Sequence, residues 1–211
     1  MSLMEIPRET SLEAGGHAKG VAVAIVRQNK DDSGMGRVKV SYPWHSQPRE
    51  SYWALIAMPM TGKGMGTYFL PEVGDEVLVA FERGDLRFPY VVGSLWNGVD
   101  ASPVNNTDGN NDLRVIQTRS GHKLTFDDGQ RAKIQIQFKD GRKKITIDDD
   151  GVLIEDGTDS IALKSNGGEI AIQAGTKISL KAPQISLQAS GPITVEASAI
   201  LTLKGATVLI N

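Results

Sequence analysis

The C-terminal part of the chain repeats one short pattern: an apolar residue, a polar residue and a second apolar residue. Within residues 178–210 this triplet occurs five times, and its first residues are separated by steps of 7, 8, 8 and 7. Alternation with a period of two is typical of a β-strand that has one buried face. Each unit therefore predicts a short strand with only two inward side chains, followed by a corner of Gly, Ala, Ser, Pro or Asn.

The same alternation begins further upstream with longer units. Six expected strands lie at 123–126, 133–138, 144–147, 152–155, 160–163 and 169–172. The early ones are joined at Asp-Gly steps, which begin at Asp128, Asp140, Asp150 and Asp156. Asp-Gly supplies the positive φ angles that tight turns need. Self-similarity over so many units predicts a repeat architecture in which each unit is a single strand.

The N-terminal half predicts a different kind of β structure. Five strand candidates follow closely between residues 21 and 98, at 21–29, 36–43, 52–59, 76–84 and 88–96, and loops rich in Gly, Ser and Asp separate them. Five strands in so short a stretch predict a small closed barrel of the size of an OB-fold. The sequence thus predicts an all-β chain.

We expect five segments along the chain. They are a flexible or docking N-terminal arm (1–20), a five-stranded OB-fold barrel (21–98), a polar linker (99–112), a hairpin-rich neck (113–144) and an intertwined trimeric β-helix, or needle (145–211).

The length of the repeat unit predicts three chains. Coils of single-chain β-solenoids usually need about twenty residues per turn, so one copy of an eight-residue unit leaves its apolar pair exposed to water. Three copies around an axis bury each pair and leave no long free strand edge along the sides. At a strand spacing of about 4.8 Å, eight or nine units give a needle of roughly 40–45 Å. The alternatives are a single-chain solenoid and a β-sandwich with regular strands.

The residues expected in the trimer core are the inward apolar pairs of the needle. They are Ile145, Ile147, Val152, Ile154, Ile161, Leu163, Ile170, Ile172, Ile178, Leu180, Ile185, Leu187, Ile193, Val195, Leu201, Leu203, Val208 and Ile210.

Composition narrows the possible functions. The formal net charge is −2, which provides no overall attraction to nucleic acid or anionic lipid. There are no cysteines, so a disulfide framework and a thiolate nucleophile are both excluded. The N-terminus lacks the basic and apolar regions of a secretory signal, and no run approaches the roughly 18 apolar residues of a membrane span. We expect a protein made in the cytoplasm without a signal peptide.

The residues that could carry chemistry have structural interpretations. His122 lies near Asp127 and Asp128, and we interpret it as a turn histidine rather than a metal ligand or a base. The acidic run at 148–159 lacks the spacing of a calcium-binding loop, and the glycines at 62–66 lack a phosphate-binding spacing. Three tryptophans (Trp44, Trp53 and Trp96) are expected in barrel core or interface packing rather than in a nucleic-acid stacking platform. We therefore expect no enzyme activity, cofactor or metal.

Residues 21–98 resemble the OB-fold domain of VgrG-type and phage baseplate spike proteins. The resemblance rests on strand-like "GRVKV", "VGDEVLV" and the residues between and after them; the motif positions are Gly36, Pro43, Trp44, Gly62, Gly64, Gly66, Pro71, Gly74, Asp75, Gly84, Asp85, Gly93 and Gly98. Residues 118–128, "TRSGHKLTFDD", resemble the segment that opens the β-helix in phage-like members. Together with the repeat, the similarity covers about nine-tenths of the chain.

The resemblance implies a homotrimeric spike at the tip of a contractile injection machine, such as a phage tail, a type VI secretion apparatus or an extracellular injection system. A spike of this kind is assembled into the particle and meets the target membrane only transiently. Larger members carry a long hub region ahead of the OB-fold, where this chain has about twenty residues. Either the hub is a separate polypeptide or the sequence is the C-terminal part of a longer protein, and we expect a hub or baseplate protein at the N-terminal side, where residues 1–20 would dock. We expect neither a lysozyme-like insertion nor a fused effector.

The tip is expected to need a partner. Some spikes of this family close their tip with an ion held by a His-x-His motif, but His17, His45 and His122 are the only histidines here. The needle would end on the apolar residues Val208, Leu209 and Ile210, beside Asn211. An exposed apolar end of this kind needs a protein that covers it. In this family a small PAAR-type protein commonly does so, and we predict that these four residues bind such a cap.

Two other functions stay open from the residues alone. One is a β-helical tail fibre that binds or cleaves polysaccharide, although the repeat region holds only Phe126 and Phe138 as aromatic residues and offers little for sugar stacking. The other is an OB-fold nucleic-acid binder with a trimerisation tail, which the acidic net charge disfavours.

Overall fold

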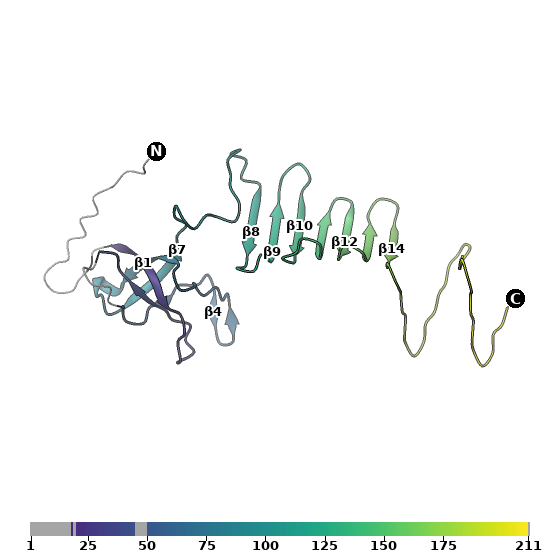
Figure 1. Cartoon of the computed structure of the whole chain (residues 1–211), viewed down its shortest axis with the longest axis horizontal. Helices are drawn as coiled ribbons and strands as arrows, with labels where there is room; N and C mark the ends of the chain where they lie inside the picture. The colour runs from purple at the N-terminus through teal and green to yellow at the C-terminus, as the bar shows by residue number, and fades with distance from the viewer. Residues whose placement is uncertain (1–17, 19, 45–49, 211) are drawn as a thin grey trace. The chain divides into compact units, whose positions relative to one another are not determined.

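A computed structural model of the chain describes residues 18, 20–44 and 50–210, which are almost entirely β-strand, turn and extended chain. The prediction of an all-β protein is confirmed. The chain divides into two compact units, Met1–Thr107 and Asp108–Asn211 (Figure 1). The expected N-terminal arm up to His17, as well as His45 and Asn211, lies outside the described residues.

The first unit is built on a five-stranded sheet. Its strands are β1 (Val21–Gln28), β2 (Lys39–Ser41), β3 (Leu55–Ile56), β6 (Glu76–Phe81) and β7 (Pro89–Ser94), in the order β2-β1-β6-β7-β3. Neighbours are antiparallel except β3 and β7, which are parallel. A two-stranded hairpin, β4 (Thr61–Gly62) with β5 (Met65–Gly66), and a short 3-10 turn, η1 (Glu82–Gly84), complete the unit.

Alternation along the strands produces the core of this unit. In β6, every second residue is buried, as the period of two requires. The buried apolar side chains come from β1, β2, β6, β7 and the segments beside β2 and β3: Ala22, Ala24, Val26, Val38, Val40, Tyr42, Ala54, Val77, Val79, Phe81 and Val91. The first unit therefore contains a hydrophobic core of its own.

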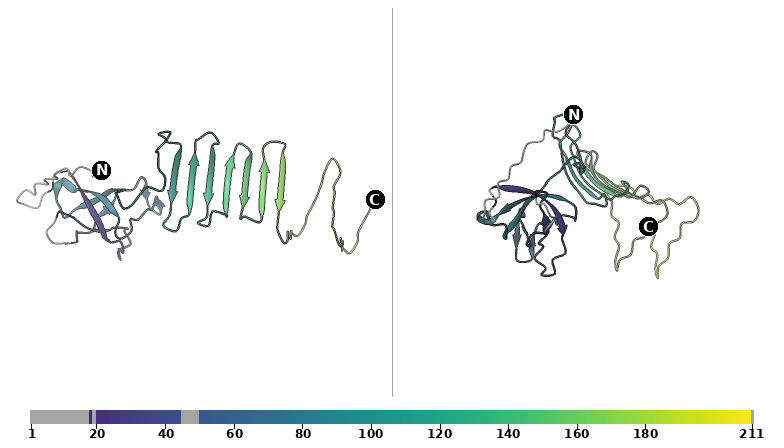
Figure 2. Two further views of the ribbon diagram at one scale, coloured as in Figure 1. Left: turned by 45° about the horizontal axis from the view of Figure 1, so that its top comes forward. Right: turned by 60° about the vertical axis from the view of Figure 1, so that its left-hand side comes forward.

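The second unit begins as a seven-stranded antiparallel meander, shown side-on in Figure 2. Its strands are β8 (Leu113–Gln117), β9 (Lys123–Asp127), β10 (Lys133–Gln137), β11 (Lys144–Asp148), β12 (Gly151–Glu155), β13 (Ser160–Lys164) and β14 (Glu169–Gln173). Each strand pairs with its neighbours in the sequence. All six strands expected between 123 and 172 are present, and β8 precedes them.

The turns of the meander use the expected chemistry, with one exception. Gly141, Gly151 and Gly157 have φ angles of 76°, 138° and 96°, as predicted for Asp-Gly steps. Gly129 is absent from the positive-φ glycines, so the β9–β10 connection is a turn of another kind. Asp140 and Asp156 each accept two backbone N–H groups in their own turns, and these hydrogen bonds lower the pKa of both carboxyls.

Residues 174–210 contain no strand within the single chain. Figure 1 shows this stretch, in yellow-green, running on from β14 in wide bends that do not return to the sheet. The five triplets were expected to form strands, and here they have no partner strand among the described residues. Their backbone groups are therefore left for another chain or for water.

Candidate assembly surface

One face of the meander carries two parallel rows of apolar side chains. The strand registers place residues opposite one another in an unbroken series across all seven strands: Ile116, Leu124, Ile136, Ile145, Ile154, Ile161 and Ile172. The second row, two residues along each strand, consists of Phe126, Ile134, Ile147, Val152, Leu163 and Ile170. Residues two apart share a face of a strand, so both rows form one apolar face.

The apolar face is open in the single chain. Ile147 is 45% exposed, and Ile170, near the end of the sheet, is 71% exposed. Burial of apolar surface is favourable by about 25 cal/mol per Å². Exposed apolar patches of this continuity mark interaction surfaces in soluble proteins.

A groove runs along the first row. It has a volume of about 890 Å³, and its floor is formed by the isoleucines of that row, from Ile116 to Ile172, with Ile178 beyond them. His122 and Phe138 lie at its rim, with ring centres 4.6 Å apart, and Lys143 lies over the Phe138 ring at 5.1 Å. Aliphatic walls with few polar groups suit another apolar surface better than a polar substrate.

The opposite face carries most of the polar side chains of the strands, which pair with one another, together with Val115, Leu153, Ala162 and Ala171. Ion pairs link Lys133 to Asp127 (3.8 Å), Lys144 to Glu155 (3.0 Å) and Lys164 to Glu169 (3.0 Å), each between neighbouring strands. Gln135 donates to the hydroxyl of Thr146 at 3.1 Å. Cross-strand pairs of opposite charge stabilise the register and leave this face suited to solvent. The sheet is thus two-sided, with its apolar side uncovered.

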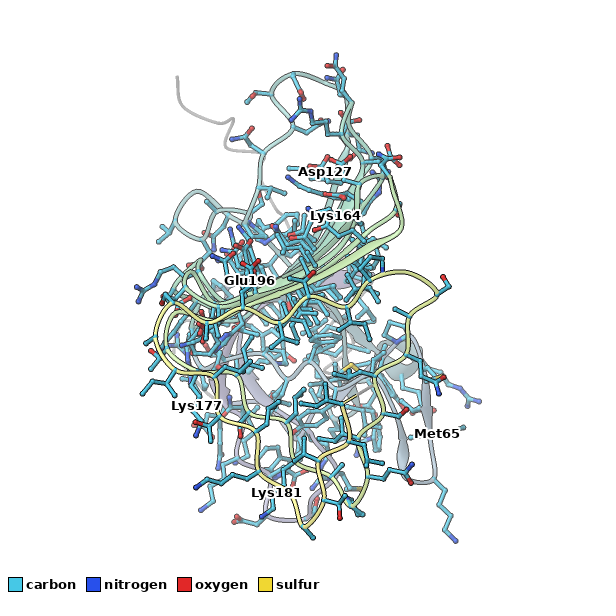
Figure 3. The ribbon with its side chains drawn as sticks, turned by 90° about the vertical axis from the view of Figure 1, so that its right-hand side faces the viewer. Met65, Asp127, Lys164, Lys177, Lys181 and Glu196 are labelled. Carbon is cyan, nitrogen blue, oxygen red and sulfur yellow. The ribbon has the colours of Figure 1, made fainter. Side chains whose placement is uncertain are left out.

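The segment after β14 continues the apolar pattern without the sheet. Leu187 is 72% exposed and Ile193 55%, and the other triplet residues are similarly exposed. Viewed along the long axis, the chain leaves the sheet at Lys177, passes Lys181 on another side and returns across the view near Glu196 (Figure 3). It follows a winding course instead of reversing against β14, so its apolar pairs have no cover within the chain.

The predicted core residues lie in two settings. Those from Ile145 to Ile172 belong to the two rows of the meander, and those from Ile178 to Ile210 belong to the segment without strands. The rows also begin earlier than expected, because Ile116, Leu124, Phe126, Ile134 and Ile136 extend them upstream. The i, i+2 spacing of apolar residues in "KLTF" and "KIQIQF" indicates the same apolar face, but these residues were expected in a separate neck.

The four predicted tip residues are placed in part. Leu209 and Ile210 are almost fully exposed, and Val208 is half exposed. Asn211 lies outside the described residues. The apolar end therefore has no cover from the described part of its own chain.

The OB motif residues lie mainly in turns that hold the barrel strands. Gly36, Gly64, Gly66, Gly74 and Gly84 have positive φ angles. A Cβ on Gly66 would lie 2.7 Å from the carbonyl oxygen of Met60, so the close approach of the two backbones requires glycine there.

The polar and aromatic motif residues make local contacts. Asp75 accepts the backbone N–H of Glu72, Asp85 forms an ion pair with Arg87, and Asn29 donates to the carbonyl of Pro71. Trp44 follows Pro43 and stacks on Tyr42 with ring centres 5.1 Å apart. Gly62 lies in β4, Gly93 in β7 and Gly98 just beyond it.

A buried ion pair stabilises the loop after β1. Arg37 donates from Nε to Asp31 at 2.8 Å and from a second nitrogen at 3.1 Å, and the Asp31 side chain is almost fully buried. This bond to Arg37 holds the pKa of the Asp31 carboxyl far below its usual value of 3.8. The guanidinium also lies over the Trp53 ring at 5.4 Å, with Lys39 at 5.2 Å, while Trp96 is exposed.

The described residues contain no group of three or more His, Cys, Asp or Glu side chains that could hold a metal ion. In the same part of the chain, no helix has the length and apolar character needed to cross a membrane.

Comparison with known proteins identifies both units. Residues 22–96 match the family described as the type VI secretion system/phage-baseplate injector OB domain. Residues 114–191 match the phage baseplate V C-terminal trimerisation domain. The expected OB-fold is thereby confirmed, and the second match coincides with the apolar face described above.

Curated relatives are spike proteins. The chain is 30% identical over 120 residues to the type VI secretion system spike protein VgrG1a of Pseudomonas aeruginosa, and this alignment covers 53% of the chain and 18% of the relative. It is 35% identical over 72 residues to the type VI secretion system spike protein VgrG3 of Vibrio cholerae, an alignment that covers 32% of the chain and 7% of the relative. It is 34% identical over 116 residues to VgrG5 of P. aeruginosa, with 46% of the chain and 15% of the relative covered. The chain thus spans less than a fifth of the length of these relatives.

Proposed function

Because the chain belongs to the phage baseplate V and type VI secretion injector family, we propose that it forms the homotrimeric spike of a contractile injection machine. The observation that carries this proposal is the uncovered apolar face, whose two rows continue as exposed triplets to residue 210. Three copies placed around one axis cover the face of each chain with those of the other two. The resulting rod has few free strand edges along its sides.

The proposed role is structural. A rod that is pushed through an envelope must be stiff and narrow, and a dry core with short strands across the axis provides both properties. The polar face, with its paired charges, then lies outward. We propose that the needle pierces the target membrane during contraction and acts without catalysis.

Two partners belong to the proposal. A PAAR-type cap would cover the apolar end at Val208, Leu209 and Ile210, which are exposed in the single chain. A hub or baseplate protein would dock at the N-terminal unit, where Tyr68 and Trp96 are among several exposed aromatic side chains. The spike would be assembled in the producing cell and delivered with the particle.

Immunogold electron microscopy of contractile particles from the producing bacterium tests this function. Antibody against the second unit should place gold at one end of the inner tube. A particle lacking this chain should carry no gold there. Gold along the sheath, or only on fibres at the side of the baseplate, would contradict a spike and favour the fibre alternative.

A further inference from the structure

The two edges of the meander carry opposite charge. In an antiparallel meander, successive turns lie alternately at the two ends of the strands. We call each of these two rows of turns an edge of the meander. The turns after β8, β10 and β12 (118–122, 138–143 and 156–159), with residues 174–177 that follow the last strand, form the basic edge. The turns after β9, β11 and β13 (128–132, 149–150 and 165–168) form the acidic edge. Figure 3 shows Lys177, of the basic edge, on the opposite side from Asp127 and Lys164, which precede acidic-edge turns.

The charges follow from the sequence of these turns. The basic edge holds five Lys or Arg residues against three Asp, a net charge of +2. The acidic edge holds three Asp against one Arg, a net charge of −2. On the basic edge, the carboxylates accept backbone N–H groups: Asp159, for example, accepts the N–H of Gly175 at 2.8 Å. Within single sheets, Lys143 of the basic edge pairs with Asp140 at 3.5 Å, and Asp128 of the acidic edge pairs with Arg114 at 3.0 Å.

Several of these charged groups form no ion pair within 4 Å in the described part of the chain. On the basic edge, Arg142 acts on Asp156 only from a distance and its stem lies over the Gly157 turn, while Lys139 lies beside Gly121 and over the Phe138 ring at 5.9 Å. On the acidic edge, Asp149 makes no ion pair, and the adjacent Asp150 has only a long 3.5 Å contact with Asn166. Adjacent carboxylates without a cation repel each other, and a partner that supplies cations relieves that repulsion.

We infer that the basic edge of one copy docks against the acidic edge of the next. The complementary charges then hold the sheets of three copies together in a closed ring. This inference rests on the proposed homotrimer. Two unlike edges produce a head-to-tail contact, and a head-to-tail contact that closes forms a ring. The turn holding Arg142 and the turn holding Asp149 flank the same strand, β11, so in an aligned ring they lie within about 4.8 Å along the axis.

Charge reversal tests the pairing in the full chain. One variant carries Lys139→Glu with Arg142→Glu, a second carries Asp149→Lys with Asp150→Lys, and a third combines all four changes. A control carries Lys30→Glu with Lys63→Glu, which changes the net charge equally in the first unit. Each protein is refolded from denaturant at one concentration, and trimer formation is followed by light scattering at low salt and at about 1 M salt, where screening is nearly complete.

Each single-edge reversal should slow trimer formation about tenfold at low salt, because it removes electrostatic steering and places like charges together. The combined variant should recover the parent rate, the control should match the parent, and 1 M salt should remove the differences. The inference is overturned if the single-edge variants assemble like the parent, or if the combined variant is as slow as they are. In both cases the homotrimer stands. A parent that stays monomeric removes the homotrimer and the edge pairing together.

Discussion

The two units bury their apolar side chains in different ways. Every buried apolar side chain of the described part belongs to the first unit, where Val26, Val79 and Val91 are almost inaccessible to solvent. In the second unit only Thr146 is buried, although apolar residues alternate along the strands as regularly as in the first. The first unit thus has its core within one chain, while the apolar face of the second is left uncovered in the single chain.

This difference shows that the alternation of apolar and polar residues determines which side chains share one face of a sheet, but not what covers that face. In the barrel, strands far apart in sequence, such as β1 and β6, close over a shared interior. In the meander every strand pairs with its sequence neighbours, so the sheet extends in one direction and does not close over its own apolar face. The pairing order decides which outcome occurs, because strand length differs little between β6 and β7, with six residues each, and the meander strands, with five.

The largest expected effect comes from a charge on the needle axis. Ile193→Asp places three carboxylates together in a dry core, and an unpaired buried charge is very costly. We expect this variant to lose the trimer while the first unit keeps the near-ultraviolet dichroism of Tyr42 and Trp44. Light scattering and circular dichroism measure the two outcomes.

The matched control is Thr194→Asp, which adds the same charge on the opposite side of the strand. It should trimerise like the parent. If Ile193→Asp trimerises and melts like the parent too, the needle core does not contain Ile193.

The second effect concerns Leu187, which is exposed in the single chain and is expected to be buried in the trimer. Leu187→Ala should destabilise the trimer by about 2–5 kcal/mol per chain, the usual cost of a large-to-small change in a core. Denaturant titration of the full chain should show the loss in the trimer transition. Val79→Ala should instead lower only the transition of the first unit, by about 1–3 kcal/mol. An unchanged trimer transition in Leu187→Ala would mean that Leu187 remains in solvent.

A third effect separates two glycines of the same sheet. Gly151 has a φ of 138°, and a Cβ there would lie 1.9 Å from the carbonyl oxygen of Leu163, so Gly151→Ala forces β12 away from β13. We expect a loss of about 3 kcal/mol or more in the meander. Gly168→Ala also has a positive φ but meets no atom within 4 Å, so it should cost only about 1 kcal/mol.

Hydrogen exchange of the β12 and β13 amides provides the readout. Protection should fall strongly in Gly151→Ala and only slightly in Gly168→Ala. Equal protection in the two variants would show that β12 and β13 are not in the close register described here.

The smallest effect is a pH dependence that differs between the units. The folded pKa of Asp31 is depressed by Arg37, so its contribution is present above the usual carboxyl pKa of 3.8 and is lost as the pH falls below it. Asp140 behaves in the same direction through backbone N–H groups. In Asp31→Asn, the first unit should be less stable at neutral pH and should lose less further stability on acidification.

Asp140→Asn should show a weaker change, because an asparagine oxygen can still accept the two N–H groups of the turn. Denaturant midpoints measured between about pH 5 and pH 2 compare the two variants. A steeper acid loss in Asp31→Asn than in the parent would contradict the assigned pKa direction.

Much of the fold follows from local pattern. Alternation located the five strands of the first sheet and β9 to β14, but not the β4–β5 hairpin or β8, and Asp-Gly steps located the turns at Gly141, Gly151 and Gly157. The strand pairing was harder to predict from the sequence. Residues 145–172 were expected to be intertwined with other chains, yet each of their strands pairs with strands of its own chain. Alternation alone does not distinguish a neighbour in the same chain from one in another, because both satisfy the same backbone groups. Ile116 was missed for a different reason: in residues 113–117 the alternating apolar pair is Leu113 and Val115, which lie on the other face of β8.

The central claim is that the apolar face is covered by two further copies of the chain. The most direct test is the solution mass by light scattering, with an unheated SDS gel beside it. A mass of three chains that resists SDS until the sample is boiled is the predicted result. A single-chain mass across the accessible concentration range would contradict the trimeric spike.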